Sequence, residues 1–223
     1  MSATVVTRDQ ELKAPYFKLY SYNESPNGIK LKVIFKLLKT DYYLQNVDLM
    51  GKQEQREEWF LKISPSGRIP VLEHVDENGN KKFIFESAAI SYYLVNKLDE
   101  KHEISYPVDT PLYYEELEWT FFTATTYEAA RFSQFWQLLV IPKTGAPPNE
   151  RLLVDLASQI EKCYAVYEAQ LKKTGTGYLV GSQLSVADIV SYPWMVCLAL
   201  PQFDGEKYPN LKSWSEKMIK LSK

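Results

Sequence analysis

The sequence contains few residues of the kinds that bind metals or form disulfides. Its 223 residues include two cysteines, Cys163 and Cys197, and two histidines, His74 and His102. Two cysteines are too few for a disulfide-stabilised scaffold or a cysteine zinc cage. Two histidines are too few for a histidine-rich metal centre. We therefore expect no bound metal.

A charge bias and a long apolar segment are also missing. Lys and Arg number 26 and Asp and Glu 28, so the formal net charge is only -2. This balance provides no field to attract nucleic acid or an anionic membrane. No apolar run approaches the roughly 20 residues of a membrane helix, and the first fifteen or so residues lack the pattern of a secretory signal. We expect a cytoplasmic protein with neither nucleic acid nor membrane as a partner.

The pattern of residues 16–98 indicates an α/β layer fold. Apolar alternation predicts strands, and apolar residues at helical spacing predict helices. The predicted strands cover residues 16–20, 42–49, 71–74 and 82–85, and the predicted helices cover 29–38, 55–61 and 87–98. No strand or helix is predicted for the polar residues before Tyr16. Because strands and helices alternate in this way, residues 15–100 are expected to form one small domain.

Strand patterns nearly vanish in the second half. The polar residues 101–111 are interpreted as a linker. Four helices are predicted beyond it, over residues 115–139, over 150–172, from Ser185 onward and over 211–220. Ser185 and Asp188 have the spacing of a capping box, which indicates a helix start. Residues 112–223 are therefore expected to be an all-helical domain.

Four motifs follow one another along the chain: Glu54-Gln55, residues 59–72 with Ile69-Pro70, residues 85–90 with Glu86-Ser87, and residues 178–188. In this order they resemble the motifs of the cytosolic glutathione transferases. Pro26-Asn27-Gly28 is similar to the fungal branch around the yeast nitrogen-regulator prion protein and its bacterial relatives. The resemblance implies an α/β thioredoxin-like domain that binds glutathione, followed by an all-α domain with an electrophile pocket. Ser64 and Ser66 depart from it, since the family usually has asparagine there.

Asn27 is the candidate for activating the thiol of glutathione. A free thiol with a pKa near 8.5 is only a few per cent ionised at neutral pH, and lowering that pKa by about two units takes roughly 2.7 kcal/mol. An amide N–H at a helix N-terminus can help supply this. The pattern alone favours a helix cap for Asn27, whereas the resemblance implies that it holds the sulfur. Ser25 ranks second, and Tyr20, Ser21 and Tyr22 are further alternatives.

The resemblance also implies the other glutathione contacts. The peptide bond before Pro70 would be cis, and the N–H and C=O of Ile69 would pair with the cysteinyl backbone of glutathione. Glu86 would bind the γ-glutamyl ammonium, and Ser87 would bind its carboxylate at a helix N-terminus. Gln55 and Arg68 would complete the site. The structural alternatives are a helix cap for Ser87, a first-turn charge for Glu86 and a surface charge for Arg68.

The electrophile is expected to lie against the helix over residues 115–139. Tyr127 and Arg131 are i,i+4 neighbours, so they share one face of this helix. We expect them to point toward the cleft, while Cys163 and Cys197 act as inert packing. The predicted function is a glutathione transferase of detoxification type that conjugates the thiolate to hydrophobic electrophiles, with glutathione as co-substrate and no cofactor. The alternatives are glutathione-dependent peroxide or disulfide reduction and a non-catalytic interaction module.

We predict a homodimer with twofold symmetry, the commonest closed symmetry. The resemblance implies that the two kinds of domain pair between copies, and the aromatic helix over residues 115–139 has more apolar surface than one core stripe requires. Light scattering at micromolar concentration should give about twice the chain mass of 25.9 kDa. A monomer mass would contradict the dimer and would assign the excess aromatic residues to a larger substrate pocket.

Overall fold

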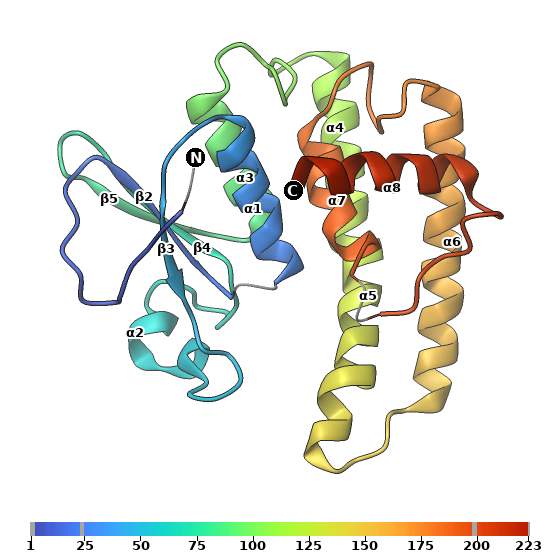
Figure 1. Ribbon diagram of the computed structural model, residues 1–223, viewed down its shortest axis with the longest axis horizontal. Helices are drawn as coiled ribbons and strands as arrows, with labels where there is room; N and C mark the ends of the chain where they lie inside the picture. Colours follow the sequence, from blue (N-terminus) through green and yellow to red (C-terminus); the bar gives the residue numbers. More distant parts are fainter. Residues whose placement is uncertain (1–2, 23–24, 198–199, 223) are drawn as a thin grey trace. The chain divides into compact units, whose positions relative to one another are not determined.

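A computed structural model describes residues 3–22, 25–197 and 200–222. The chain divides into two compact units, Met1–Lys101 and His102–Lys223. The first unit contains a sheet with helices, and the second is helical throughout (Figure 1). In the part of the chain that is described, no helix combines the length and apolar character needed to cross a membrane.

The first unit is built on a mixed sheet of five strands in its described residues. The strands are β1 (Thr4–Val5), β2 (Tyr16–Ser21), β3 (Tyr43–Asn46), β4 (Val71–Val75) and β5 (Lys81–Phe85), in the order β1-β3-β2-β4-β5. β3 runs parallel to β1 and β2, while β4 runs antiparallel to β2 and β5. The short hairpin between β4 and β5 contains Asn78-Gly79, and Gly79 has the positive φ of 80° that this turn requires.

Helices cover both faces of this sheet. They are α1 (Pro26–Leu37) and α3 (Ser87–Leu98), which pack against each other, and α2 (Glu58–Leu61), which follows a 3-10 turn over Glu54–Arg56. Phe17 of β2 meets Phe35 of α1 at a ring distance of 5.7 Å. Tyr20 instead belongs to a buried cluster with Phe60 of α2. Odd and even positions of β2 therefore face opposite layers, as the period of a strand requires.

The second unit contains a long helical run and three further helices among its described residues. The run consists of α4 (Pro111–Phe122), a π segment (Thr123–Tyr127), α5 (Glu128–Phe135), a second π segment (Trp136–Val140) and a 3-10 turn (Ile141–Thr144). α6 (Glu150–Thr174), α7 (Val186–Met195) and α8 (Pro209–Ser222) follow. The helix predicted over residues 115–139 is thus longer than expected, and its regular hydrogen bonding changes twice.

Asp188 connects three parts of the helical unit. Ser185 and Asp188 form the capping box of α7, which confirms that prediction. The fully buried Asp188 carboxylate also accepts hydrogen bonds from the backbone N–H of Leu179 at 2.9 Å and from Nε1 of Trp214 at 2.8 Å. Burial raises the pKa of Asp188 to about 6, although these hydrogen bonds oppose the increase. One carboxylate therefore joins the start of α7 to α8 and to the loop before α7.

In the first unit, the sequence-based elements agree with the structure from Tyr16 onward. The predicted strands and helices of residues 16–98 are all present, with bounds that differ by a few residues. The expectation of no element before Tyr16 was wrong, because β1 pairs with β3 and is itself an edge strand of the sheet. The β-branched run Thr4-Val5-Val6 is the sequence signal that indicates this strand.

Replacing Asp188 should destabilise the protein strongly. Asp188→Ala leaves the buried donors of Leu179, Ser185 and Trp214 without an acceptor, so we expect a loss of about 3–5 kcal/mol in the free energy of unfolding. Because the folded-state pKa is raised, the stability linked to Asp188 is present at low pH and declines as the pH rises toward 6. Urea unfolding should therefore show a larger loss at pH 5 than at pH 7.

The exposed Asp155 of α6 provides the control for this experiment. Asp155→Ala should change the unfolding free energy by no more than about 0.5 kcal/mol. Equal effects of the two substitutions would contradict the role assigned to Asp188.

Candidate functional site

The register of the sheet brings four segments of the first unit to one edge. Val71 pairs with Tyr20 on one side and with Phe85 on the other. The residues just beyond these pairs, Ser21, Pro70 and Glu86, therefore lie at the same edge. α1 begins shortly after β2, α3 begins directly after β5, and the segment with Gln55 follows β3 at this edge. The predicted glutathione ligands are thus gathered from separate parts of the chain.

Gly28 allows α1 to start close to the end of β2. A Cβ atom at this position would collide with Oγ of Ser21. Gly28 has an ordinary negative φ, so the requirement comes from the lack of space and not from the backbone conformation. The Pro-Asn-Gly motif therefore has a steric reason that is independent of any ligand.

Asn27 lies inside the first turn of α1 and does not cap it. The N-cap is Ser25, whose Oγ accepts a hydrogen bond from the N–H of Gly28 at 3.4 Å. Pro26 occupies the first helical position and Asn27 the second, where its side chain is half-buried. The capping role that the pattern favoured for Asn27 therefore belongs to Ser25.

Two of the alternative hydroxyl groups have partners elsewhere. The buried Tyr20 donates its hydroxyl to Oε2 of Glu73 at 2.5 Å, and burial together with Glu73 raises the pKa of Tyr20. Ser21 is fully buried and donates to the carbonyl of Tyr22 at 3.3 Å. The Glu73 carboxylate also accepts from Tyr16 at 2.7 Å, so these side chains form a structural polar cluster across β2 and β4.

The loop before β4 is braced by a serine. The buried Ser64 donates its hydroxyl to the carbonyl of Arg68 at 2.8 Å and accepts from the N–H of Arg68 at 3.3 Å. The Ile69–Pro70 peptide bond is cis, as the resemblance implied. Within the described residues, the backbone N–H and C=O of Ile69 form no hydrogen bond. The main chain of Ile69 thus keeps a donor and an acceptor for an extended peptide, which suits pairing in the manner of an added strand.

The N-terminus of α3 lacks a side-chain cap. Its N-cap position is Glu86, which has φ 70° and ψ 114° and makes no capping hydrogen bond. A positive φ at a non-glycine residue costs about 1–3 kcal/mol and is often found at ligand sites. Ser87 was a candidate N-cap, but it is the first helical residue, and its Oγ lies 3.3 Å from Nζ of the buried Lys30. Sequence reasoning missed Lys30, because a lysine within a helical pattern ordinarily lies on the exposed side.

Gln55 is hydrogen-bonded within the protein, whereas Arg68 is exposed. The side chain of Gln55 donates to the carbonyl of Leu49 at 3.2 Å, while its Oε1 is buried without a hydrogen-bond donor among the described residues. Arg68 is exposed on the loop before cis-Pro70. The Gln55 side chain therefore ties the 3-10 turn to the preceding loop at Leu49, whereas a ligand can reach the side chain of Arg68.

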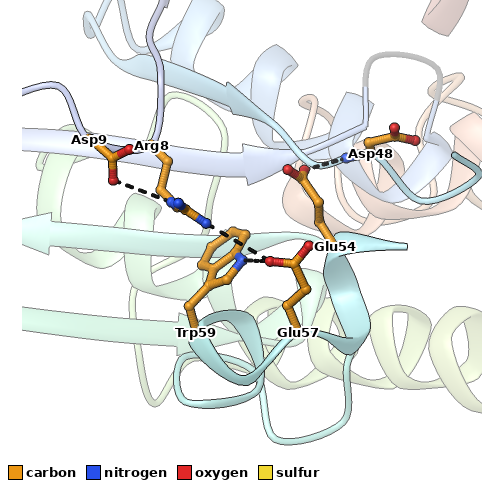
Figure 2. A network of polar contacts seen from close by, with 6 residues as sticks. All are labelled: Arg8, Asp9, Asp48, Glu54, Glu57 and Trp59. Atoms are coloured by element: carbon orange, nitrogen blue, oxygen red, sulfur yellow. Dashed lines mark hydrogen bonds and ion pairs between the residues drawn. The ribbon is translucent and has the colours of Figure 1, made fainter. Parts of the chain in front are cut away.

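An N-terminal arm, residues 4–9, contacts the segment that carries Gln55 (Figure 2). The guanidinium of Arg8 lies 5.5 Å from the centre of the Trp59 ring and 3.9 Å from the Glu57 carboxylate. Glu57 also accepts a hydrogen bond from Nε1 of Trp59 at 2.7 Å. On the other side of this segment, Glu54 accepts from the N–H of Asp48 at 2.8 Å. The arm and the turn at Asp48 thus hold the 3-10 turn and α2 from two directions.

The expectation that Tyr127 and Arg131 point toward a cleft is not met. Both are fully buried within the helical unit. Tyr127 donates to the sulfur of Met195 at 3.3 Å, and Arg131 donates to the carbonyls of Trp194 and Pro201. The face that they share is therefore the core face of the helix. A buried guanidinium needs such acceptors, and backbone carbonyls near the end of α7 provide them.

The cysteines do not offer an alternative nucleophile at the site. Cys163 is buried in α6, and burial raises its pKa to about 11. Cys197 is half-buried in the helical unit, and both cysteines are free of disulfides. Among the described residues no cluster of three or more His, Cys, Asp or Glu side chains is placed to hold a metal.

The chain matches two family models that together cover most of its length. The model described as glutathione S-transferase, N-terminal domain, matches residues 15–96, and that of the C-terminal domain matches residues 118–221. Glutathione S-transferase 1 of Schizosaccharomyces pombe is 31% identical over an alignment 222 residues long that covers 91% of each chain. The disulfide-bond oxidoreductase YfcG of Escherichia coli is 30% identical over 87% of this chain and 86% of its own. A crystal structure of a glutathione transferase homologue from Lodderomyces elongisporus with two GSH per subunit superposes with a TM-score of 0.84, at 28% identity over 94% of each chain.

A thioredoxin-like unit followed by a helical unit is the two-domain architecture of this class of transferase. The chain belongs to the glutathione S-transferase family. The predicted fold, the predicted family with its fungal and bacterial relatives, and the prediction of a glutathione transferase are confirmed. The assignment of individual residues to glutathione binding remains a prediction.

The N-terminal arm should restrain the segment that carries Gln55. A cation–π contact at an exposed site contributes about 0.5–1 kcal/mol. Arg8→Ala should therefore increase hydrogen exchange of the amides in residues 54–61 by about two- to fivefold. The exposed Lys13 of the same N-terminal region is the control, since Lys13→Ala should leave this exchange unchanged. Unchanged exchange in Arg8→Ala would show that the arm only covers the sheet edge.

Proposed function

We propose that this protein transfers the sulfur of glutathione to hydrophobic electrophiles. The observation that carries this proposal is the convergence of three elements at one edge of the sheet. The first turn of α1 contributes Asn27, the loop at cis-Pro70 contributes the main chain of Ile69, and the start of α3 contributes Glu86 and Ser87. Their order along this edge suits the sulfur, the cysteinyl backbone and the γ-glutamyl group of one peptide.

Each part of the site has a distinct chemical task. The Asn27 amide and the first turn of α1 stabilise the thiolate by donating hydrogen bonds to it. Ile69 pairs with the peptide backbone. Glu86 neutralises the γ-glutamyl ammonium, while Ser87 and the uncapped N–H groups of α3 bind the adjacent carboxylate. Arg68 and Gln55 add polar contacts to the remainder of glutathione.

Exposed aromatic side chains on the long helical run support an apolar electrophile. Phe121, Phe132 and Trp136 expose 59%, 39% and 42% of their surface. Trp136 begins a π segment, a distortion that frequently occurs at functional sites. These residues replace Tyr127 and Arg131 as candidates for binding the electrophile. The same surface suits the proposed homodimer, and the expected cytoplasmic location and detoxification role also stay predictions.

Glutathione-dependent disulfide reduction is the second candidate. It is favoured by the similarity to a bacterial disulfide-bond oxidoreductase. With Cys163 buried and its pKa raised, glutathione would have to supply the reacting sulfur. Both reactions begin with the same bound thiolate. Parallel assays with an aryl halide and with a small organic disulfide distinguish them, because the first yields a thioether and the second oxidised glutathione.

Asn27→Ala should raise the pKa of the bound glutathione thiol. A hydrogen bond to a charged group is worth about 1.5–3 kcal/mol, which corresponds to roughly one to two pKa units. The pH profile of kcat with the aryl halide should shift its acidic limb upward by that amount, and glutathione affinity should change less. Ultraviolet absorbance of the bound thiolate reports the same pKa directly.

Two further variants test this assignment. Asn96→Ala, at an exposed position of α3, should leave the profile unchanged. Ser25→Ala removes a helix cap and should cost about 1 kcal/mol of stability without moving the thiol pKa. A shift in Ser25→Ala together with none in Asn27→Ala would transfer the role to Ser25.

A further inference from the structure

Lys30 connects the two helices that begin at the candidate site. It lies on α1, three residues after Asn27, and its side chain has no exposed surface. Its Nζ lies 3.3 Å from Oγ of Ser87, the first residue of α3. α1 and α3 lie side by side against the sheet (Figure 1). The contact therefore links the two N-terminal turns that carry the proposed glutathione ligands.

This contact determines how the Ser87 hydroxyl can be used. A lysine ammonium has three donors and no acceptor, so Oγ of Ser87 must accept the hydrogen bond. Within residues 3–22, 25–197 and 200–222, the Ser87 side chain makes no other hydrogen bond. Its own hydrogen is consequently not donated to any of these residues. The Ser87 hydroxyl can therefore donate a hydrogen bond to an acceptor atom of a ligand.

The electrostatics of this position favour an anionic acceptor. The first turn of α3 presents backbone N–H groups that no side chain caps, at the positive end of the helix dipole. The amino group of the buried Lys30 lies behind Ser87, where solvent screens a charge less than at the surface.

We propose that Lys30 is a positioning residue for glutathione and acts through Ser87 to select the carboxylate of the γ-glutamyl group. The proposal rests on the proposed function and extends it to a residue that does not touch the sulfur. Lys30 therefore contributes to the affinity for one end of glutathione and to the KM. The chemistry at the sulfur, and hence kcat at saturation, is separate from it.

The test compares glutathione with an analogue that lacks only this carboxylate, 4-aminobutyryl-cysteinyl-glycine. Lys30→Met keeps the length of the side chain and removes its charge and donors. It should weaken glutathione binding about 10- to 100-fold by calorimetry, raise KM by a similar factor and leave kcat within about twofold. Binding of the analogue should change by less than about twofold. Lys36→Met, at an exposed position of the same helix, should affect neither ligand.

The coupling to Ser87 provides an independent measurement. Ser87→Ala should also weaken glutathione and spare the analogue, and Ser87→Thr should restore binding because it keeps the hydroxyl. The double variant of Lys30→Met with Ser87→Ala should bind glutathione no worse than Lys30→Met alone, within about twofold. Should Lys30→Met fail to fold, the two Ser87 variants still decide whether this hydroxyl binds the carboxylate. Lys30→Arg, which keeps a charged donor, should then bind glutathione as the parent does, and a loss shared equally by glutathione and the analogue would contradict the role of Lys30.

The outcomes distinguish the role of Lys30 from glutathione binding as such. Equal weakening of glutathione and the analogue, or additive losses in the double variant, would overturn the role of Lys30 and leave it as packing between α1 and α3. A parent protein that binds no glutathione would overturn the proposed function itself.

Discussion

The pairing of Val71 with both Tyr20 and Phe85 is the constraint on which the rest of the first unit depends. It places Pro70 beside the ends of β2 and β5, so that two helix starts and one loop meet at a single edge. A slip of one residue would turn every side chain of β4 to the opposite face. It would exchange the fully buried Val71 and Leu72 between two faces that pack against different helices. Core packing and site geometry are therefore specified by the same register.

The site retains features that cost stability. Glu86 has a positive φ, and the long polar side chain of Lys30 is fully enclosed. Such strain persists where the surrounding structure holds it in place, and it is concentrated at ligand sites. Tight packing at Gly28 and the braced loop at Ser64 provide that support. Both contacts lie next to residues proposed to bind glutathione.

Predictions from neighbouring residues succeeded at Ser185 but not at the start of α1, and the prediction about direction in space failed. The capping box at Ser185 is a local signal, since its partners lie within one turn. Tyr127 and Arg131 share a helix face, as their spacing requires, but that face is the core. The helix carries aromatic residues on several sides, so its periodicity cannot identify the side that is buried. A lysine at position 30 likewise gives no local indication that it is enclosed.

The order of the strands and helices from Tyr16 onward, the capping box at Ser185 and the family motifs were determined by the sequence alone. They depend on spacing along the chain and on backbone preferences, and both are local. Only the tertiary structure decided that Ser25 and not Asn27 caps α1, that Arg8 lies over Trp59, and that Lys30 meets Ser87. The last two contacts join residues about fifty positions apart. Such pairs are brought together by sheet register and helix packing, which no local pattern records.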